Sequence, residues 1–219
     1  MAINKRLINT QAGGVIPTDL AAWYKLDGNA NDSSGNGYNG TPSNITYTTG
    51  QFGQAASFNG TNSGITISDT ADLRLTGDYT ISLWLNVSSI GTIQRPINKD
   101  DANDFSAGYA FVVETNGDLS WVHNDGSTNQ IWNTGVNLST NTWYNITCVY
   151  SDSLNLRTIY VNGVSQNTIA TNTNVAAGTE TLNLGYLQVY GQRLNGLLDQ
   201  VRIYNIALDS DQVLALYNE

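Results

Sequence analysis

The chain is short of cysteine and of charged residues, and each shortage excludes a class of protein. Its single cysteine, Cys148, cannot form a disulfide within the chain. Charged residues make up 12% of the 219 residues, against a usual share of roughly 25%. The 18 Asp and Glu outnumber the 9 Lys and Arg, and the resulting net charge of −9 argues against a nucleic-acid partner, which would require a basic surface. No apolar run approaches the length of a transmembrane helix.

The first 17 residues differ from the rest of the sequence. They contain no alternating strand pattern, they include Gly13-Gly14, and they end at Pro17. They also lack the apolar run of a secretory signal peptide. We therefore expect an extended arm over residues 1–17 and one domain over residues 18–219. We also expect the protein to stay in the cytosol, or to leave it by a route other than secretion.

Short runs with a period of two alternate with turn clusters over most of the chain, which is typical of an all-β sandwich. Asn116-Gly117 and Asn162-Gly163 separate paired runs and predict hairpin turns. In residues 79–87 one face is wholly apolar, so we expect a half-buried strand there. The clearest runs are residues 55–58, 63–67, 79–87, 109–114, 118–123, 143–150, 156–161 and 197–204. We expect Cys148 to be a buried structural thiol in one of them.

Only one segment has helical spacing. Asp209 followed by Gln212 resembles a capping box, and Val213, Leu214 and Leu216 follow it on one side. We expect a short C-terminal helix that packs against the sandwich.

Several motifs together resemble the laminin-G-like members of the concanavalin A-like lectin/glucanase superfamily. The opening motif is Trp-Tyr-Lys-Leu-Asp-Gly at residues 23–28, and the closing one is Leu-Leu-Asp-Gln-Val-Arg-Ile-Tyr-Asn at residues 197–205. Between them, residues 32–41, 53–60, 80–85, 142–144 and 159–163 follow in the order of the family. The resemblance spans roughly residues 19–219. It implies an all-β, antiparallel jelly roll of two curved sheets, with ligands on the concave face or at one rim.

Three aspartates are candidate ligands of a structural calcium ion. Asp27 and Asp32 lie in a loop with Gly28, Asn29 and Asn31, which offers oxygen atoms at short spacing. Asp199 interrupts an apolar strand, where an uncompensated charge is costly. In the family that the chain resembles, an Asp of the closing strand and the N-terminal Asp loop commonly share an ion. The alternative is that Asp199 accepts backbone N–H groups or pairs with a cation, and that Asp32 caps an Asx-turn.

Exposed aromatic rings with neighbouring amides and carboxylates would suit a glycan. The candidate residues are Trp121, Trp132, Tyr190, Asn124 and Asp125. Tyr186, together with Tyr190, flanks a loop after Gly185 from which it could reach a rim. Trp121 shares its strand face with Leu119, however, and a core position is the alternative for any of these tryptophans.

The sequence gives little support to catalysis. Glycoside hydrolysis needs two carboxyl groups about 5 to 10 Å apart, whereas Glu occurs only at positions 114, 180 and 219 and no strand carries acids at i and i+2. The acids at positions 100, 101 and 104 lie in a stretch from Lys99 that reads as a solvated loop. The lone His123 is interpreted as a surface histidine. We expect no enzymatic activity.

An adhesive fold normally works outside the cell, whereas this sequence shows no export signal. A particle that assembles in the cytosol and is released by lysis would reconcile the two observations. We therefore expect a bacteriophage virion surface protein, either a capsid decoration or a fibre subunit, with a cell-surface glycan as candidate ligand. Its arm would dock on other virion or capsid subunits through Lys5, Arg6, Leu7 and Ile8. The alternatives are an extracellular carbohydrate-binding module of a secreted protein and a divergent glycoside hydrolase.

Overall fold

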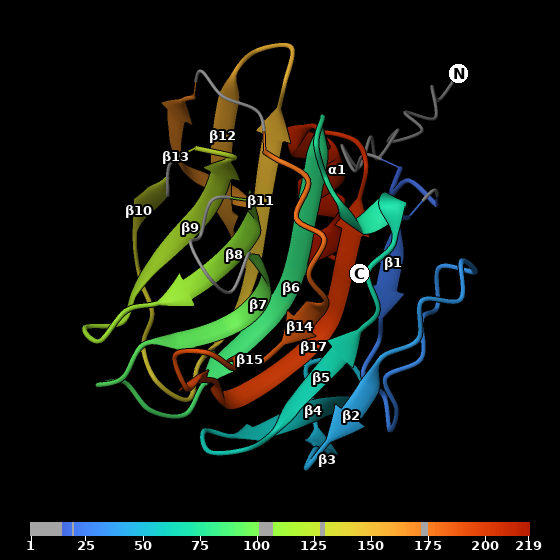
Figure 1. Cartoon of the computed structure of the whole chain (residues 1–219), viewed down its shortest axis with the longest axis vertical. Coiled ribbons are helices and arrows are strands. Elements are labelled where there is room, and N and C mark those ends of the chain that lie inside the picture. Colours follow the sequence, from blue (N-terminus) through green and yellow to red (C-terminus); the bar gives the residue numbers. More distant parts are fainter. Residues whose placement is uncertain (1–14, 19, 101–106, 128–129, 172–174) are drawn as a thin grey trace, which may run out of the picture.

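Two antiparallel sheets face each other across one apolar core (Figure 1). The computed structural model describes residues 15–18, 20–100, 107–127, 130–171 and 175–219. Within them, sheet A has the strand order β13-β12-β11-β6-β17-β4-β3, and β1 also pairs with β17. Its strands are Ala22–Tyr24 (β1), Thr46–Thr49 (β3), Gln54–Asn59 (β4), Tyr79–Val87 (β6), Trp143–Ser151 (β11), Leu156–Val161 (β12), Val164–Ala170 (β13) and Asn195–Tyr204 (β17).

Sheet B has the order β10-β9-β8-β7-β14-β5-β2 in the same part of the chain. Its strands are Thr41–Ser43 (β2), Gly64–Ile67 (β5), Gln94–Asp100 (β7), Ala107–Val113 (β8), Asp118–Asp125 (β9), Ile131–Asn137 (β10) and Leu182–Leu184 (β14). A small hairpin of Tyr186–Leu187 (β15) and Gln192–Arg193 (β16) lies beside β7, and a 3-10 turn covers Ala71–Leu73. The predicted all-β class with two antiparallel sheets is confirmed.

The predicted C-terminal helix is also confirmed as α1, Ser210–Tyr217. The Asp209 carboxylate accepts the backbone N–H of Gln212, and the Gln212 side chain accepts the backbone N–H of Asp209, which completes the capping box. Val213 and Leu216 pack with Val149 and Tyr204 on the outer face of sheet A. No helix in the described part of the chain has the length and apolar character needed to cross a bilayer.

The core consists of side chains from the inner faces of both sheets. On β6 the residues Ile81, Leu83, Leu85 and Val87 are at most 1% exposed. The prediction that β6 is only half-buried is wrong, because its other face is covered as well. There Trp84 stacks on Tyr217 of α1, with 5.7 Å between ring centroids. The helix therefore converts an outward face of sheet A into a second buried layer.

The interior also holds polar residues that the sequence placed on the surface. His123 was predicted to be a surface residue, and this is wrong: it is fully buried on the inner face of β9. Its Nδ1 lies 3.2 Å from the Tyr79 hydroxyl, and its ring centroid lies 4.7 Å from that of Tyr150. Cys148 is buried, as predicted.

Strand β17 lies in the middle of sheet A, between β6 and β4, as Figure 1 shows. Its pairing with β6 is irregular between Asp199 and Arg202, and β1 pairs with the residues that follow, from Val201 to Ile203. The first and last strands of the sheet therefore meet beside Asp199. This arrangement positions the first candidate site.

Candidate functional site

Asp199 is a buried carboxylate with one unpartnered oxygen. The residue is fully buried, and its Oδ2 accepts the backbone N–H of Phe52 at 2.8 Å. Its Oδ1 is buried and has no hydrogen-bond partner in the part of the chain that the structure describes. Burial raises the pKa of Asp199 to about 6, although the backbone N–H groups of Phe52, Gln51 and Gln200 oppose this rise, and the nearby charge of Asp27 adds to it. A buried carboxylate with this environment is stabilised by a bound cation or by protonation.

Asp27 lies on the other side of the same turn. Its Oδ1 accepts the backbone N–H of Gln54 at 3.0 Å. A Cβ on Gly50 would lie 2.6 Å from Asp199 Oδ2, and a Cβ on Gly53 would lie 3.1 Å from Asp27 Oδ1. The turn that leads into β4 therefore fits between the two carboxylates only because glycine occupies these positions.

The backbone next to both carboxylates is unusual. Leu26 and Gln200, which adjoin Asp27 and Asp199, have φ values of 61° and 50°. Residues other than glycine, asparagine and aspartate rarely adopt this left-handed region, and each such residue costs about 1 to 3 kcal/mol. Such strain is typical of sites where side chains must be held in a set position.

Asp32 does not join this pair, which corrects the predicted set of three ligands. No group of three or more acidic, histidine or cysteine side chains that could hold a metal exists among the described residues. Asp32 Oδ1 accepts the backbone N–H groups of Trp23 and Ser34 at 3.0 and 2.9 Å, and Oδ2 accepts that of Tyr38 at 3.1 Å. These bonds lower the pKa of Asp32 and make it an Asx-turn residue, as the alternative interpretation stated.

The remaining pair fits a hard cation. Calcium takes carboxylate and carbonyl oxygens on loops that can wrap it, and here an orphan carboxylate oxygen lies at a glycine-rich turn beside a second carboxylate. Asp27 and Asp199 would hold the ion. A bound ion would join the first strand, the last strand and the turn before β4.

The residues predicted to bind a glycan do not form one site. Trp121 is fully buried and Trp132 is 8% exposed in the core, where their ring centroids lie 6.0 Å apart. Asn124 is buried, and its Oδ1 accepts the backbone N–H of Gln130 at 3.1 Å. Asp125 accepts the backbone N–H of Ser127 at 2.9 Å.

Neither tryptophan therefore presents its ring to a ligand in this conformation. Tyr190 is 49% exposed in the turn of the β15–β16 hairpin. The predicted docking residues Lys5, Arg6, Leu7 and Ile8 lie outside the described residues.

The same hairpin borders a polar hollow of about 230 Å³ on the outer face of sheet B. We call it the Tyr186 hollow. It is lined by Ser43, Asn62, Gly64, Thr66, Tyr186, Gln188 and Arg193. Hydroxyl, amide and guanidinium groups dominate this lining, and one aromatic ring lies among them. The sequence pointed to Tyr186 as a rim residue, but it did not indicate the others, which come from β2, β5, β16 and the segments next to them.

Gly64 allows the Tyr186 ring to lie flat on the sheet. A Cβ at position 64 would approach Tyr186 Cδ1 to 2.2 Å, so that no other residue fits beneath the ring as it lies. The Tyr186 hydroxyl is hydrogen-bonded to the Thr66 hydroxyl. Arg193 lies over the ring, with its guanidinium carbon 5.1 Å from the centroid.

A polar row leads from this hollow across sheet B. Thr66 pairs with Asn183, and Asn183 pairs with Asn98, so the three side chains share the outer face. Both amide atoms of Asn98 are buried and have no hydrogen-bond partner within the residues described. Such groups are uncommon in native structures.

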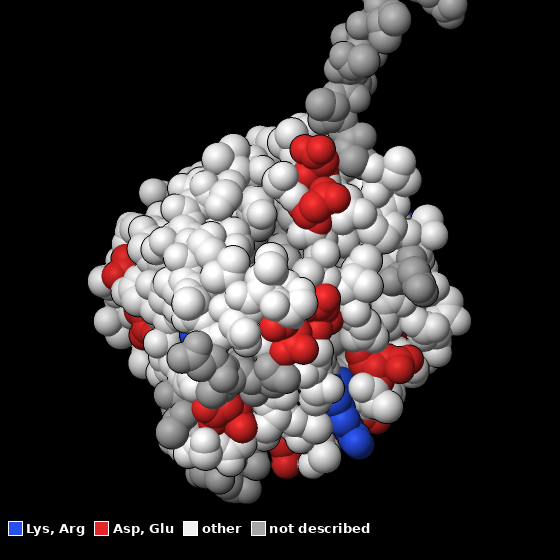
Figure 2. All heavy atoms as spheres, turned by 90° about the horizontal axis from the view of Figure 1, so that it is seen from above, with Lys and Arg blue, Asp and Glu red and all other residues white. Residues whose placement is uncertain are grey.

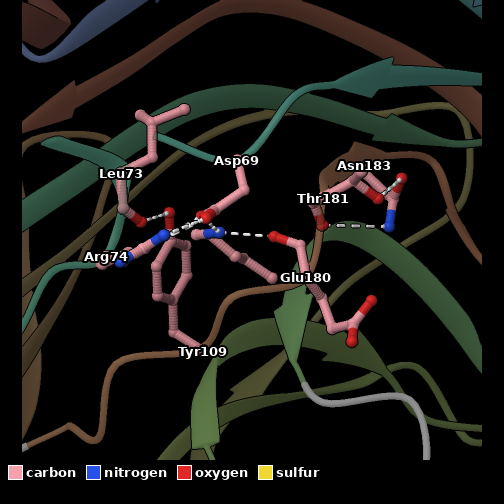
Figure 3. Close-up of polar contacts among 8 residues, drawn as sticks. Asp69, Leu73, Arg74, Tyr109, Glu180, Thr181 and Asn183 are labelled. Carbon is pink, nitrogen blue, oxygen red and sulfur yellow. Dashed lines mark hydrogen bonds and ion pairs between the residues drawn. The ribbon is translucent and has the colours of Figure 1, made fainter. Parts of the chain in front are cut away.

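A second polar cluster includes Asp69, Arg74 and Glu180, as Figure 3 shows. Lys99, which was predicted to lie in a solvated loop, is instead a buried residue of β7. Its Nζ lies 2.6 Å from Asp69 Oδ1 and also donates to the Glu180 carbonyl. Arg74 Nε donates to Asp69 Oδ2 at 3.0 Å. The Arg74 guanidinium and Lys99 together hold the pKa of Asp69 below its usual value. These bonds link the buried end of Lys99 to Asp69 and to the segment at Glu180.

Replacing Asp69 by asparagine is expected to destabilise the protein by about 2 kcal/mol, because it leaves the Lys99 ammonium buried without its counter-charge. The free energy of unfolding from urea titrations at pH 7 measures this. In a Lys99→Met background the same substitution should cost clearly less. Equal costs in both backgrounds would show that Lys99 is not the reason.

The surface charge is sparse. Figure 2 shows one face, where acidic side chains form scattered patches on a mostly uncharged surface and basic side chains are few. This distribution matches the excess of 18 acidic over 9 basic residues.

Three solved structures illustrate what the fold resembles. One is Domain 4 of AbnA, a GH43 extracellular arabinanase from Geobacillus stearothermophilus, which was solved in complex with arabinotriose. Its sequence is 26% identical to this chain and its TM-score is 0.68. The match covers 91% of this chain and 98% of that domain. The binding domain of Paraclostridial Mosquitocidal Protein 1 is 20% identical with a TM-score of 0.77, over 91% of this chain. The binding domain of botulinum neurotoxin serotype D is 16% identical with a TM-score of 0.70, over 93%. This chain spans 52% of the length of each toxin domain.

Comparison with sequence families gives the assignment. No curated protein sequence matches the chain. The family model of the concanavalin A-like lectin/glucanases superfamily matches residues 59–214, which is well over half of the chain. This match and the two-sheet sandwich agree with the resemblance seen in the sequence. The chain belongs to the concanavalin A-like lectin/glucanases superfamily.

Proposed function

We propose that this protein is a non-catalytic carbohydrate-binding module that takes its ligand at the Tyr186 hollow. The observation that carries the proposal is the lining of this hollow: hydroxyl, amide and guanidinium groups around a fixed aromatic ring, on the outer face of a rigid sheet. Ligand sites are typically hollows with a small number of placed polar groups. The volume of about 230 Å³ is below the roughly 300 Å³ of the smallest drug-sized sites and suits one sugar ring.

The chemistry of the hollow supports binding rather than cleavage. Hydrolysis of a glycosidic bond requires a carboxyl pair about 5 to 10 Å apart, and the lining of the hollow includes no carboxyl group. The buried carboxylate of Asp199 and the exposed carboxylate of Asp27 lie at a different place, at the turn before β4.

The similarity to Domain 4 of the arabinanase supports the same proposal. That domain was solved with arabinotriose, and the match covers nearly its whole length. The toxin structures are binding domains as well. We transfer to this chain only the general role of presenting a ligand-binding surface.

We further propose a structural calcium ion at Asp27 and Asp199. Its role would be to neutralise the buried carboxylate and to hold the two ends of the domain together. The orphan oxygen of Asp199 supports this assignment.

The assembly that carries the module stays a prediction from the sequence. A bacteriophage particle, with residues 1–17 as a docking arm, is one possibility, and a secreted protein is the other. Recovery of the protein with purified virions would separate them.

The test of the proposed function is a glycan array followed by isothermal titration of the saccharides that bind. We expect binding without hydrolysis, and a loss of at least tenfold in affinity for Tyr186→Ala. Tyr190→Ala is the matched control, because Tyr190 belongs to the same hairpin but does not line the hollow. Circular dichroism checks that both variants fold. If no saccharide binds the wild-type protein, or if both variants bind equally well, the proposal is wrong.

A further inference from the structure

We propose that the Tyr186 hollow selects saccharides that carry a carboxylate, and that Arg193 is the residue that recognises this group. This inference rests on the proposed function and names the class of ligand. Its basis is the charge of the hollow, the way in which Arg193 is held, and the uncharged groups that surround it.

Arg193 is the one charged residue among those that line the hollow. The hollow is built from two segments, residues 41–66 and residues 181–198, and Arg193 is the sole charged residue in both. This is unexpected in a chain with 18 acidic residues.

The guanidinium has no acidic partner in the described structure. Its Nη1 donates to the Ser63 carbonyl at 3.2 Å and its Nη2 donates to the Gln188 side chain. The ion pairs found elsewhere engage Arg74, Lys99 and Arg202. An arginine offers five N–H donors in a planar fork, so donors remain for a ligand.

The guanidinium is also held in place before a ligand arrives. The Tyr186 ring lies beneath it, Ser63 and Gln188 fix two of its nitrogens, and Gly64 and Thr66 fix the ring. A preorganised group loses little conformational entropy on binding. Arginine recognises carboxylates through paired, charge-assisted hydrogen bonds, which a lysine cannot reproduce.

The uncharged groups complete the specificity. Ser43, Asn62 and Thr66 provide hydroxyl and amide groups that suit sugar hydroxyls. A carboxylate on the same ring would then face Arg193. A uronic acid residue combines these features in one unit.

The experiment compares trigalacturonate with its methyl ester, which has the same hydroxyls but no charge. We expect the wild-type protein to bind the acid at least tenfold more tightly than the ester in isothermal titration. Arg193→Gln should remove this preference, and Arg193→Lys should restore only part of it. Lys25→Gln is the matched control: it removes the same charge from an exposed residue outside the hollow and should keep the preference.

The outcomes separate this inference from the proposed function. Equal binding of acid and ester, or a preference that survives in Arg193→Gln, overturns the role of Arg193 and leaves the carbohydrate-binding function intact. If the protein binds only neutral saccharides, the role of Arg193 is likewise overturned and the carbohydrate-binding function is kept. If neither these probes nor any saccharide of the array binds, the proposed function fails and the inference fails with it.

Discussion

The Asp199→Asn variant is expected to be more stable than the wild type without calcium and less stable than the wild type with calcium. In chelator at pH 7 the variant should be more stable by about 2 kcal/mol. The rise of the Asp199 pKa from 3.8 to about 6 corresponds to about 3 kcal/mol, and burying the amide offsets part of it. In millimolar calcium the wild type should be the more stable protein, because an ion that binds only the folded state at about 1,000 times its Kd adds about 4 kcal/mol.

The same site sets a pH dependence. A carboxyl group with a raised folded-state pKa stabilises the fold while it is protonated, below about pH 4, and this contribution is lost as the pH rises through about 6. The calcium-free wild type should therefore lose stability over this range, and Asp199→Asn should not show this loss.

Thermal unfolding with chelator and with calcium, at pH 5 and pH 7, measures these effects. Asp211→Asn is the matched control, because it removes an exposed carboxylate of α1. It should leave the calcium response unchanged. A wild-type melting temperature that is the same with chelator and with calcium would contradict the proposed ion, and a response retained in Asp199→Asn would contradict its location.

Replacing Gly196 by alanine is expected to destabilise the protein by about 3 kcal/mol or more. Gly196 lies in β17 between Val87 and Phe58 of the neighbouring strands. A Cβ at this position would lie 2.2 Å from the backbone oxygen of Asn86 and 3.1 Å from the Val87 Cα. These are backbone atoms of a central strand, so relief requires the strands β17 and β6 to separate.

Gly77→Ala is the control for this substitution. A Cβ at Gly77 meets nothing within 4 Å, and Gly77 is not among the residues with positive φ. We expect a change within about 1 kcal/mol, in the stabilising direction. Urea unfolding of both variants measures the difference, and an equal effect of the two would show that the close approach at Gly196 does not limit the packing of the sheet.

The strands with clear apolar alternation could be predicted from the sequence. The predicted range 79–87 coincides with β6 and the range 156–161 coincides with β12. The helix was recognisable because Asp209 and Gln212 carry its start signal locally. Each of these signals lies within a few neighbouring residues.

The strands that were missed have no such local signal. β13 is an exposed edge strand of mostly polar residues, so no apolar face marks it. β7 contains Pro96 and buries Lys99, whose partners Asp69 and Glu180 are far away in the sequence. His123 was misplaced for a similar reason, because only the packing of Tyr79 and Tyr150 around it explains its burial.

The candidate sites also differ in whether a local sequence signal marks them. Asp199 was recognisable as a charge within an apolar strand, and its burial is confirmed. The Tyr186 hollow was not recognisable, because it forms only when β2, β5 and the β15–β16 hairpin come together. The sequence indicated Tyr186 as a rim residue, but the lack of acidic residues in the two segments has meaning only once these segments are known to be neighbours.

Saccharide binding at the Tyr186 hollow is tested most directly by amide chemical shifts of the full chain in ¹H–¹⁵N spectra, titrated with arabinotriose and with trigalacturonate. We predict that the largest shifts fall on residues 62–66 and 186–193, with little change in α1. Shifts that cluster elsewhere, or spectra that stay unchanged with every saccharide tested, would contradict saccharide binding at the Tyr186 hollow.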